Sequence, residues 1–168
     1  MDTESSAVTR LQSALEELSR LIQTELADST VYFERGVIHG QLSDPENAVR
    51  DFTEALRLDD SNADAYYNRG VAYAHLQQPI MAVDDFTITL SINPQHLDAY
   101  NNRAAAYLDL NQLQQAIKDA DEAISLNDQL PTAYVIRGTA HSLLGQEELA
   151  NQDREKVRLI IARNVRRN

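Results

Sequence analysis

Residues 63–96 read ADAYYNRGVAYAHLQQPIMAVDDFTITLSINPQH, and the same order of aromatic, charged and small residues recurs every 34 residues along the chain. Five columns keep this period: Tyr32, Tyr66, Tyr100 and Tyr134; Arg35, Arg69, Arg103 and Arg137; Gly36, Gly70, Ala104 and Gly138; Ala48, Ala82, Ala116 and Ala150; and Asp51, Asp85, Asp119 and Asp153. A repeat of this length is a supersecondary unit that must stack on its neighbours to bury its apolar face. The sequence therefore predicts a stacked array with a long open surface.

Each repeat is expected to contain two helices. In the quoted stretch, Tyr66, Arg69 and Tyr73 share one face of a first helix. Pro79 suits the first residue of a second helix, and Pro94 ends that helix because the residue before a proline avoids the helical region. The same pattern predicts helix pairs at 30–42 with 45–58, 98–110 with 113–126, and 131–144 with 147–165.

The two ends of the chain differ from the middle. Residues 6–27 carry a heptad-like seam formed by Val8, Leu11, Leu15, Leu18 and Ile22. This helix either covers the first repeat or pairs with a second chain, so we expect a monomer or a homodimer through it. In the fourth repeat polar residues replace the apolar residues of the second, which marks its last helix as a cap: Asn151, Arg154 and Arg158 stand where Val83, Phe86 and Leu90 stand.

We accordingly divide the chain into five segments: an N-terminal amphipathic helix at 1–28, repeats at 29–62, 63–96 and 97–130, and a capping helix pair with a basic end at 131–168.

The arginine and aspartate columns are expected to form ion pairs within each repeat, because their offset of sixteen residues is constant and a half-buried charge needs a counter-charge. The expected pairs are Arg35 with Asp51, Arg69 with Asp85, Arg103 with Asp119, and Arg137 with Asp153. The alternative is an arginine ladder that grips acidic ligands. We interpret the columns as structural, since they share the packed face with tyrosine and glycine.

Taken together, these columns resemble the tetratricopeptide repeat (TPR) family over residues 29–162. Arginine replaces the usual leucine in all four repeats, and only Pro94 keeps the closing proline. The resemblance implies an all-α, right-handed solenoid of antiparallel helix pairs, here behind an extra N-terminal helix. It also implies a scaffold or adaptor for protein–protein interaction.

Helical geometry predicts which residues line the inner, concave face of the first helices, on the side opposite the packed columns. We expect this face to bind a peptide or helix of a partner, because asparagine both donates and accepts hydrogen bonds and tyrosine is an amphipathic anchor. The candidate residues are Glu34, Val37, Gln41, Asp64, Tyr67, Asn68, Val71, His75, Asp98, Asn101, Asn102, Ala105 and Asp109, extended by Val135, Thr139 and Leu143. The alternative is an ordinary solvated helix face.

One subtype of the family holds acidic C-terminal tails with lysines, asparagines and an arginine on this face. The matching positions here are Phe33, Val37, Asn68, Asp98 and Asn102 in one register, and Tyr67, Val71, Asn102, Thr132 and Ile136 in the next. Only one asparagine matches in either register and the cations are missing. We therefore expect a basic or neutral partner rather than an acidic one.

Charge supports the same expectation. The formal net charge is -11, and residues 29–149 alone carry eighteen acidic and seven basic side chains. An acidic surface disfavours nucleic acid. Residues 154–167 carry six bases, which either complement the helix dipole or form a docking tail for an acidic partner. The polar, acidic first residues, the absence of cysteine and the lack of a long apolar stretch lead us to expect a cytoplasmic protein without membrane insertion.

Catalysis is not expected. No two histidines among His39, His75, His96 and His141 have a metal-ligand spacing, and neither a phosphate-binding glycine loop nor a nucleophile elbow is present. We expect no metal and no cofactor. A different class of function remains open, namely a dedicated chaperone for an exported or assembling protein subunit.

Overall fold

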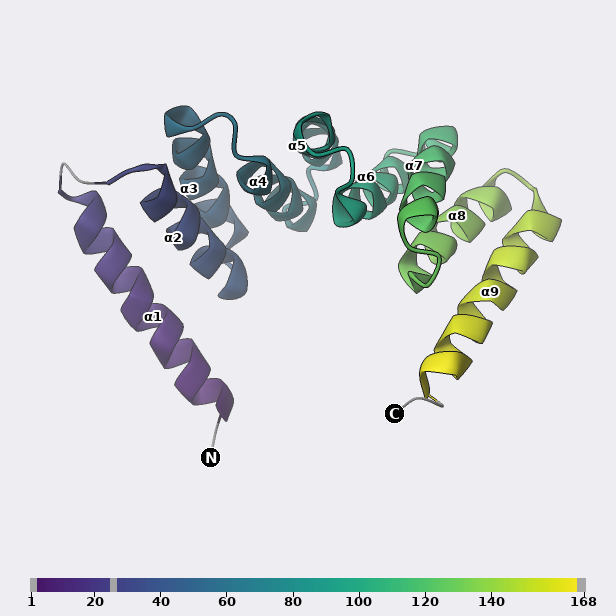
Figure 1. Ribbon diagram of the computed structural model, residues 1–168, viewed down its shortest axis with the longest axis horizontal. Coiled ribbons are helices and arrows are strands. Elements are labelled where there is room, and N and C mark those ends of the chain that lie inside the picture. The colour runs from purple at the N-terminus through teal and green to yellow at the C-terminus, as the bar shows by residue number, and fades with distance from the viewer. Residues whose placement is uncertain (1–2, 25–26, 166–168) are drawn as a thin grey trace. The chain divides into compact units, whose positions relative to one another are not determined.

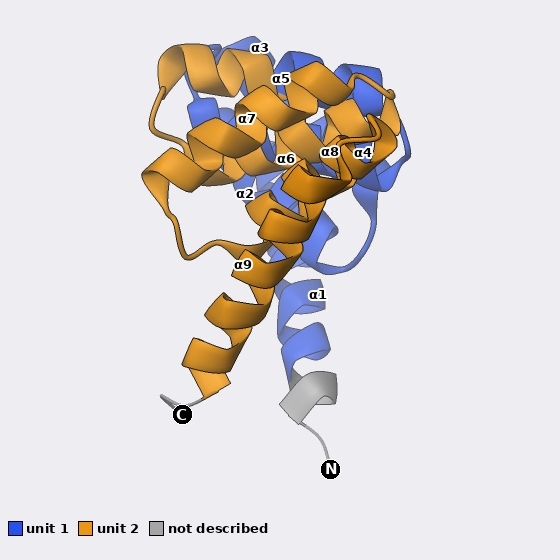
Figure 2. Ribbon diagram, turned by 90° about the vertical axis from the view of Figure 1, so that its right-hand side faces the viewer, with its two compact units in different colours: residues 1–85 blue, residues 86–168 orange. Residues whose placement is uncertain are grey.

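All regular structure in the described residues, 3–24 and 27–165 of the computed structural model, is α-helical (Figure 1). The helices are α1 Thr3–Ile22, α2 Ser29–Gln41, α3 Pro45–Leu58, α4 Ala63–His75, α5 Pro79–Ile92, α6 Leu97–Asp109, α7 Leu113–Leu126, α8 Pro131–Leu143 and α9 Glu147–Val165. The predicted all-α fold of paired helices behind an N-terminal helix is confirmed. The chain falls into two compact units, residues 1–85 and 86–168, which divide within α5 (Figure 2).

Helix starts follow the residues that the sequence offers as caps. The carboxylate of Asp28 accepts hydrogen bonds from the backbone N–H groups of Thr30 and Val31 at the start of α2. Asp44 accepts from Asn47 N at the start of α3, where Pro45 is the first helical residue. The N-terminal helix differs most from prediction, since it runs from Thr3 to Ile22 rather than over 6–27.

The turn inside each helix pair contains one residue in the left-handed region, and these residues again lie 34 apart: Ser43 (φ 59°), Gln77 (φ 56°), Asn111 (φ 55°) and Gly145 (φ 74°). In the second repeat, Gln77 N donates to Ala74 O and Gln78 N donates to Tyr73 O, which is the Schellman arrangement at a helix C-terminus. The other three turns repeat both bonds. Three of the four repeats thus hold a non-glycine residue where glycine is favoured.

In the first unit, α1 packs on α2, α2 on α3, and α3 on α4. Ala48 and Phe52 of α3 are buried together with Ala72 of α4. Gly36 of α2 faces the Phe52 ring so closely that a Cβ built on it would lie 2.8 Å from Phe52 Cε1. The small residue at this position therefore allows α2 and α3 to approach closely across an aromatic ring.

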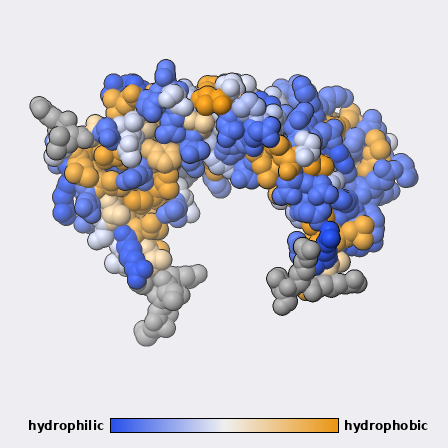
Figure 3. All heavy atoms as spheres, in the orientation of Figure 1, coloured by the Kyte–Doolittle hydropathy of each residue, from blue (hydrophilic) through white to orange (hydrophobic). Residues whose placement is uncertain are grey.

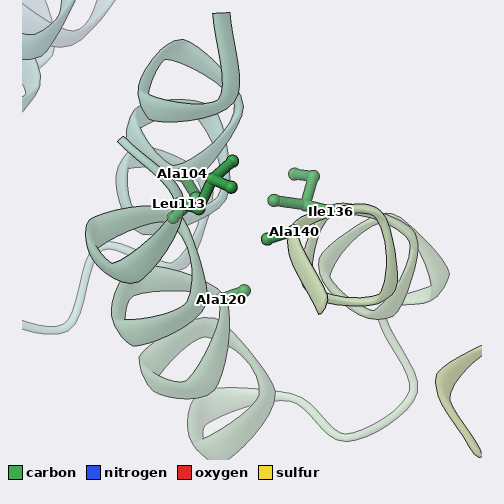
Figure 4. Close-up of a cluster of buried hydrophobic side chains, with 6 residues drawn as sticks. Ala104, Leu113, Ala120, Ile136 and Ala140 are labelled. Carbon is green, nitrogen blue, oxygen red and sulfur yellow. The ribbon is translucent and has the colours of Figure 1, made fainter. Parts of the chain in front are cut away.

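In the second unit, α6 packs on α7, α7 on α8, and α8 on α9. Figure 4 shows Ile136 and Ala140 of α8 pointing toward Ala104 of α6 and Leu113 of α7. All four side chains are buried, together with Ala116 and Ala120 of α7. The first helix of one repeat thus fills the space left by small residues in the preceding repeat.

The structure joins each predicted arginine to its aspartate by two hydrogen bonds. In Arg69, Nε donates to Asp85 Oδ2 and Nη2 to Asp85 Oδ1, both at 2.8 Å. The other three pairs show the same bidentate geometry with distances between 2.6 and 3.1 Å. Each of the four aspartates is 3% exposed. The hydrogen bond with Asp85 raises the pKa of Arg69 above its ordinary value, although burial opposes this.

Each of these arginines also reaches a residue sixteen positions earlier in the chain. The bonds run from Arg35 Nη1 to Ser19 Oγ (3.3 Å), from Arg69 Nη1 to Thr53 Oγ1 (3.2 Å), from Arg103 Nη1 to Thr87 Oγ1 (3.0 Å) and from Arg137 Nη1 to Asp121 Oδ1 (2.5 Å). One guanidinium therefore ties a first helix both to the second helix of its own repeat and to the helix before it.

We expect Gln77→Gly to raise the free energy of unfolding by about 0.5–1 kcal/mol, because the left-handed conformation costs an L-residue about 1–2 kcal/mol and the entropic cost of glycine offsets part of that gain. Urea denaturation measures the difference. Gly145→Ala is the matched control and should lower stability, since it places a Cβ in the same strained conformation. A destabilising effect of Gln77→Gly would contradict this account of the turns.

Removing one arginine should destabilise the chain strongly. Arg103→Met leaves the buried Asp119 carboxylate without its partner, and we expect a loss of about 3–5 kcal/mol. The double variant Arg103→Met/Asp119→Leu should recover most of that loss, because no buried charge remains. Arg57→Met, which breaks an exposed pair with Glu54, is the control and should cost less than about 1 kcal/mol. Equal effects of Arg103→Met and Arg57→Met in urea melts would show that the columns do not hold the helices together.

Candidate functional site

The side of the first helices that faces away from the arginine columns is the candidate surface in the first unit. None of the residues predicted there is buried: Glu34, Gln41, Asp64 and His75 are exposed, and Val37, Tyr67, Asn68 and Val71 are half-buried. The two helices that carry them, α2 and α4, contact each other directly.

A groove of about 500 Å³ runs between these helices, with α3 beneath it. Its lining consists of Val37, Gly40, Gln41, Ser43, Pro45, Ala48, Phe52, Asn68, Val71, Ala72 and His75. Five of the predicted residues are thus brought together here, two from α2 and three from α4. The buried Ala48, Phe52 and Ala72 give the groove an apolar floor, while Gln41, Asn68 and His75 give it a polar rim.

Three of the predicted residues of this unit lie outside the lining of that groove. Glu34 lines a second groove, formed by α1 and α2. Asp64 lies one helical turn before Asn68, and its backbone carbonyl accepts a hydrogen bond from Asn68 Nδ2 at 2.8 Å. Tyr67 is half-buried on α4. The predicted surface is therefore broader than the groove itself.

The groove has the chemistry of a site for a neutral or cationic chain. The side-chain amide of Asn68 donates one N–H to the backbone carbonyl of Asp64. An asparagine amide also has a second N–H donor and a carbonyl acceptor, which can bind a ligand. No lysine or arginine is among the described residues that line the groove, and Glu34 and Asp64 lie beside it. Such a surface can hydrogen-bond a peptide backbone and bury an apolar side chain, and it disfavours a carboxylate.

In the second unit the predicted residues lie along α6. Asp98 and Asp109 are exposed, and Asn101, Asn102 and Ala105 are half-buried. Thr132 Oγ1, at the start of α8, donates to Asn101 Oδ1 at 3.0 Å, so that part of the asparagine chemistry is used within the chain. Farther along α8, Val135 and Leu143 are 53% and 62% exposed.

The basic end of the chain is partly committed to local pairs. Arg154 Nη1 donates to Asn151 Oδ1 and Glu147 Oε2, and Arg158 Nη1 donates to Glu155 Oε2. Arg166 and Arg167, which belong to the predicted basic end, lie outside the described residues. The docking-tail hypothesis stays a prediction.

Within residues 3–24 and 27–165, no cluster of three histidine, cysteine or acidic side chains is arranged to hold a metal ion. Among the same residues, no helix has both the length and the apolar character needed to cross a bilayer.

The second helices contribute residues to the groove that the sequence reasoning did not include. Pro45, Ala48 and Phe52 line it from α3. A signal was present, since Ala48 belongs to a strictly periodic column and Phe52 lies four residues after it. A floor residue such as Phe52 packs on one side and lines the groove on the other.

Family models match three segments of the chain, of which the first two overlap: a TPR repeat at residues 41–77, and tetratricopeptide repeats at 63–96 and 97–130. No curated protein matches the chain.

Solved structures show the same fold. A crystal structure of MamA covers 99% of this chain and 98% of its own, with 20% identity and a TM-score of 0.90. The first TPR of Spaghetti (RPAP3), bound to the HSP90 peptide SRMEEVD, covers 70% of this chain and 94% of its own, with 24% identity and a TM-score of 0.68.

The TPR domain of Arabidopsis OM64 is 30% identical over 68% of this chain and 94% of its own, with a TM-score of 0.66. This sequence identity, the three family-model matches and the helix pairs with their repeated turns all indicate the same family. The chain belongs to the tetratricopeptide repeat family.

Proposed function

We propose that this chain is an interaction module that binds a peptide or helix of a partner protein on the open face of its first helices. The observation that carries the proposal is the groove between α2 and α4, whose apolar floor and amide-bearing rim fit a short segment of polypeptide. TPR proteins are generally interaction modules without catalysis, and a TPR relative of similar fold binds a peptide.

The proposed partner segment is basic or neutral. The peptide held by the RPAP3 domain is acidic at its C-terminal end, SRMEEVD. In this chain no cation is among the described residues of the groove lining, and carboxylates stand next to it on both helices. An acidic peptide would lose solvation without gaining a counter-charge, whereas a lysine or arginine would gain one from Glu34 or Asp64.

The proposal also assigns different roles to the two kinds of periodic residue. The buried arginine and aspartate columns hold the helices, and the variable residues at 68, 71 and 75 on the opposite side of α4 select the ligand. This separation allows a ligand-selecting residue to change without loss of the fold, which is what an interaction scaffold requires.

A displayed peptide library selected on the full chain tests the proposal. We expect peptides that are neutral or basic, and the affinity of the basic peptides should fall as salt concentration rises. Val71→Arg should weaken binding of a selected peptide at least about tenfold, because it fills the groove and opposes a basic ligand. Fluorescence anisotropy gives the dissociation constants.

Ala74→Arg is the matched control, since it adds the same side chain at an exposed position of α4 that is outside the groove lining. It should bind as the unmodified chain does, and circular dichroism should show the same helicity and Tm for both variants. Equal affinity of both variants for every selected peptide would refute the groove as the binding site. Selection of acidic peptides alone would refute the proposed charge preference.

A further inference from the structure

The N-terminal helix follows the same 34-residue period as the second helices of the repeats. Ala14 stands 34 residues before Ala48, Glu17 before Asp51, and Ser19 before Thr53. The contact is equivalent too, since Arg35 donates to Ser19 Oγ as Arg69 donates to Thr53 Oγ1. Helix α1 therefore packs on α2 as the second helix of a repeat whose first helix is not among the described residues.

The face of α1 that such a first helix would cover is open. In the next repeat, α2 covers the corresponding face of α3, where Ala48, Asp51, Phe52 and Ala55 are at most 3% exposed. On α1, Glu17 is exposed, Leu21 is 40% exposed, and Ala14 and Leu18 are half-buried. A groove of about 580 Å³ lies here, lined by Ala14, Glu17, Leu18, Leu21, Phe33, Glu34, Val37, Ile38 and Gln41.

Hydropathy marks the same region. Figure 3 shows hydrophobic residues gathered over the α1 and α2 part of the chain. The hydrophobic residues of this groove lie beside the carboxylate of Glu17. Glu17 stands at the position where every complete repeat has an aspartate bound to an arginine. Glu17 has no ion pair or hydrogen bond within the described part of the chain.

The complete repeats show what such a groove accepts. Each first helix places an arginine on the aspartate, and the residue that follows the arginine is small: Arg35-Gly36, Arg69-Gly70, Arg103-Ala104 and Arg137-Gly138. The small residue is required where a bulky side chain faces it, as the short approach of Gly36 to Phe52 shows. Leu18 occupies the position of Phe52 on α1.

We infer that the α1–α2 groove binds, from another protein, an amphipathic helix with an arginine followed by glycine or alanine. This helix takes the place that the first helix has in a complete repeat, and its arginine pairs with Glu17. The acidic lining, Glu17 and Glu34, and the apolar lining, with Leu18 and Val37, complement such a helix.

The backbone of α1 favours a helix from another chain. Complete repeats turn at Ser43, Gln77, Asn111 and Gly145, and the equivalent position in α1 is Thr9. Thr9 lies inside α1, so the short turn that links the two helices of a repeat cannot form there.

A second copy of this chain fits the groove poorly. Its four arginine-small pairs are already bound within their own repeats. At its basic end, Arg158 is followed by Leu159, which is not the small residue that follows the arginine in the complete repeats.

The test titrates the full chain into a fluorescein-labelled helical peptide with the sequence of residues 63–78, stapled on its solvent side so that the helix is already formed. Anisotropy should show saturable binding. We expect binding to weaken about tenfold or more when the peptide carries R69Q or when the chain carries Glu17→Gln, as the loss of a charge-assisted pair implies. Combining Glu17→Arg in the chain with R69E in the peptide should restore binding.

Glu16→Gln is the matched control, because Glu16 is a neighbouring exposed carboxylate that is outside the groove lining and pairs with Arg20 at 3.7 Å. It should leave binding unchanged. The two grooves share Val37 and Gln41, but Val71 lines the α2–α4 groove and not this one, so Val71→Arg should also leave binding unchanged.

Three results would overturn the inference. The first is no saturable binding below about 1 mM. The second is binding that is insensitive to Glu17→Gln but lost with Val71→Arg, which would place the peptide in the other groove. The third is a concentration-dependent increase in mass, measured by sedimentation without peptide, that Glu17→Gln abolishes, since a second copy would then occupy the site.

Discussion

The stack depends on each buried aspartate having its arginine partner. Two charges are taken largely out of water in every repeat, so the fold needs their geometry to be good, and the four carboxylates accept two hydrogen bonds each. The third guanidinium contact reaches the preceding helix. One side chain thus sets the spacing within a repeat and the junction to the helix before it. Removing it would leave a buried carboxylate rather than a mere cavity.

This arrangement leaves much of the opposite side of the first helices outside the packed columns. Because arginine, tyrosine and the small residues all serve the packed side, positions such as 68, 71 and 75 can differ between repeats at little cost to stability. The α2–α4 groove is built from those positions above a floor of packed residues. The same division explains the open face of α1, which has the residues of a second helix and is covered by no first helix among the described residues.

Much of the fold could be predicted from the sequence because several independent signals agreed in phase. The periodic columns, the prolines at 45, 79 and 131, and the capping Asp44 all indicated the same helix boundaries. The phase of α1 was missed because it keeps only half of the motif. Ala14, Glu17 and Ser19 are present, but the tyrosine and arginine of a first helix are absent. The hydrogen bond between Thr132 and Asn101 could not be foreseen either, because it depends on rotamers across a turn of the stack.

In two of the repeats, the small residue after the arginine varies together with the residue that faces it on the second helix. Gly36 faces the Phe52 ring, and an added Cβ would lie within 3 Å of it. In the third repeat the same two positions are Ala104 and Ala120, which are both buried in one cluster. Compared with the first repeat, the third repeat has alanine in place of glycine on the first helix and alanine in place of phenylalanine on the second. The larger residue on one helix is therefore accompanied by a smaller residue on the other, and the two helices stay in close contact. In the first and third repeats, the residue at this column is therefore limited by the summed volume of two facing side chains. In the proposed α1–α2 site Leu18 stands at the position of Phe52, and this limit is our reason for expecting a small residue after the arginine of the docked helix.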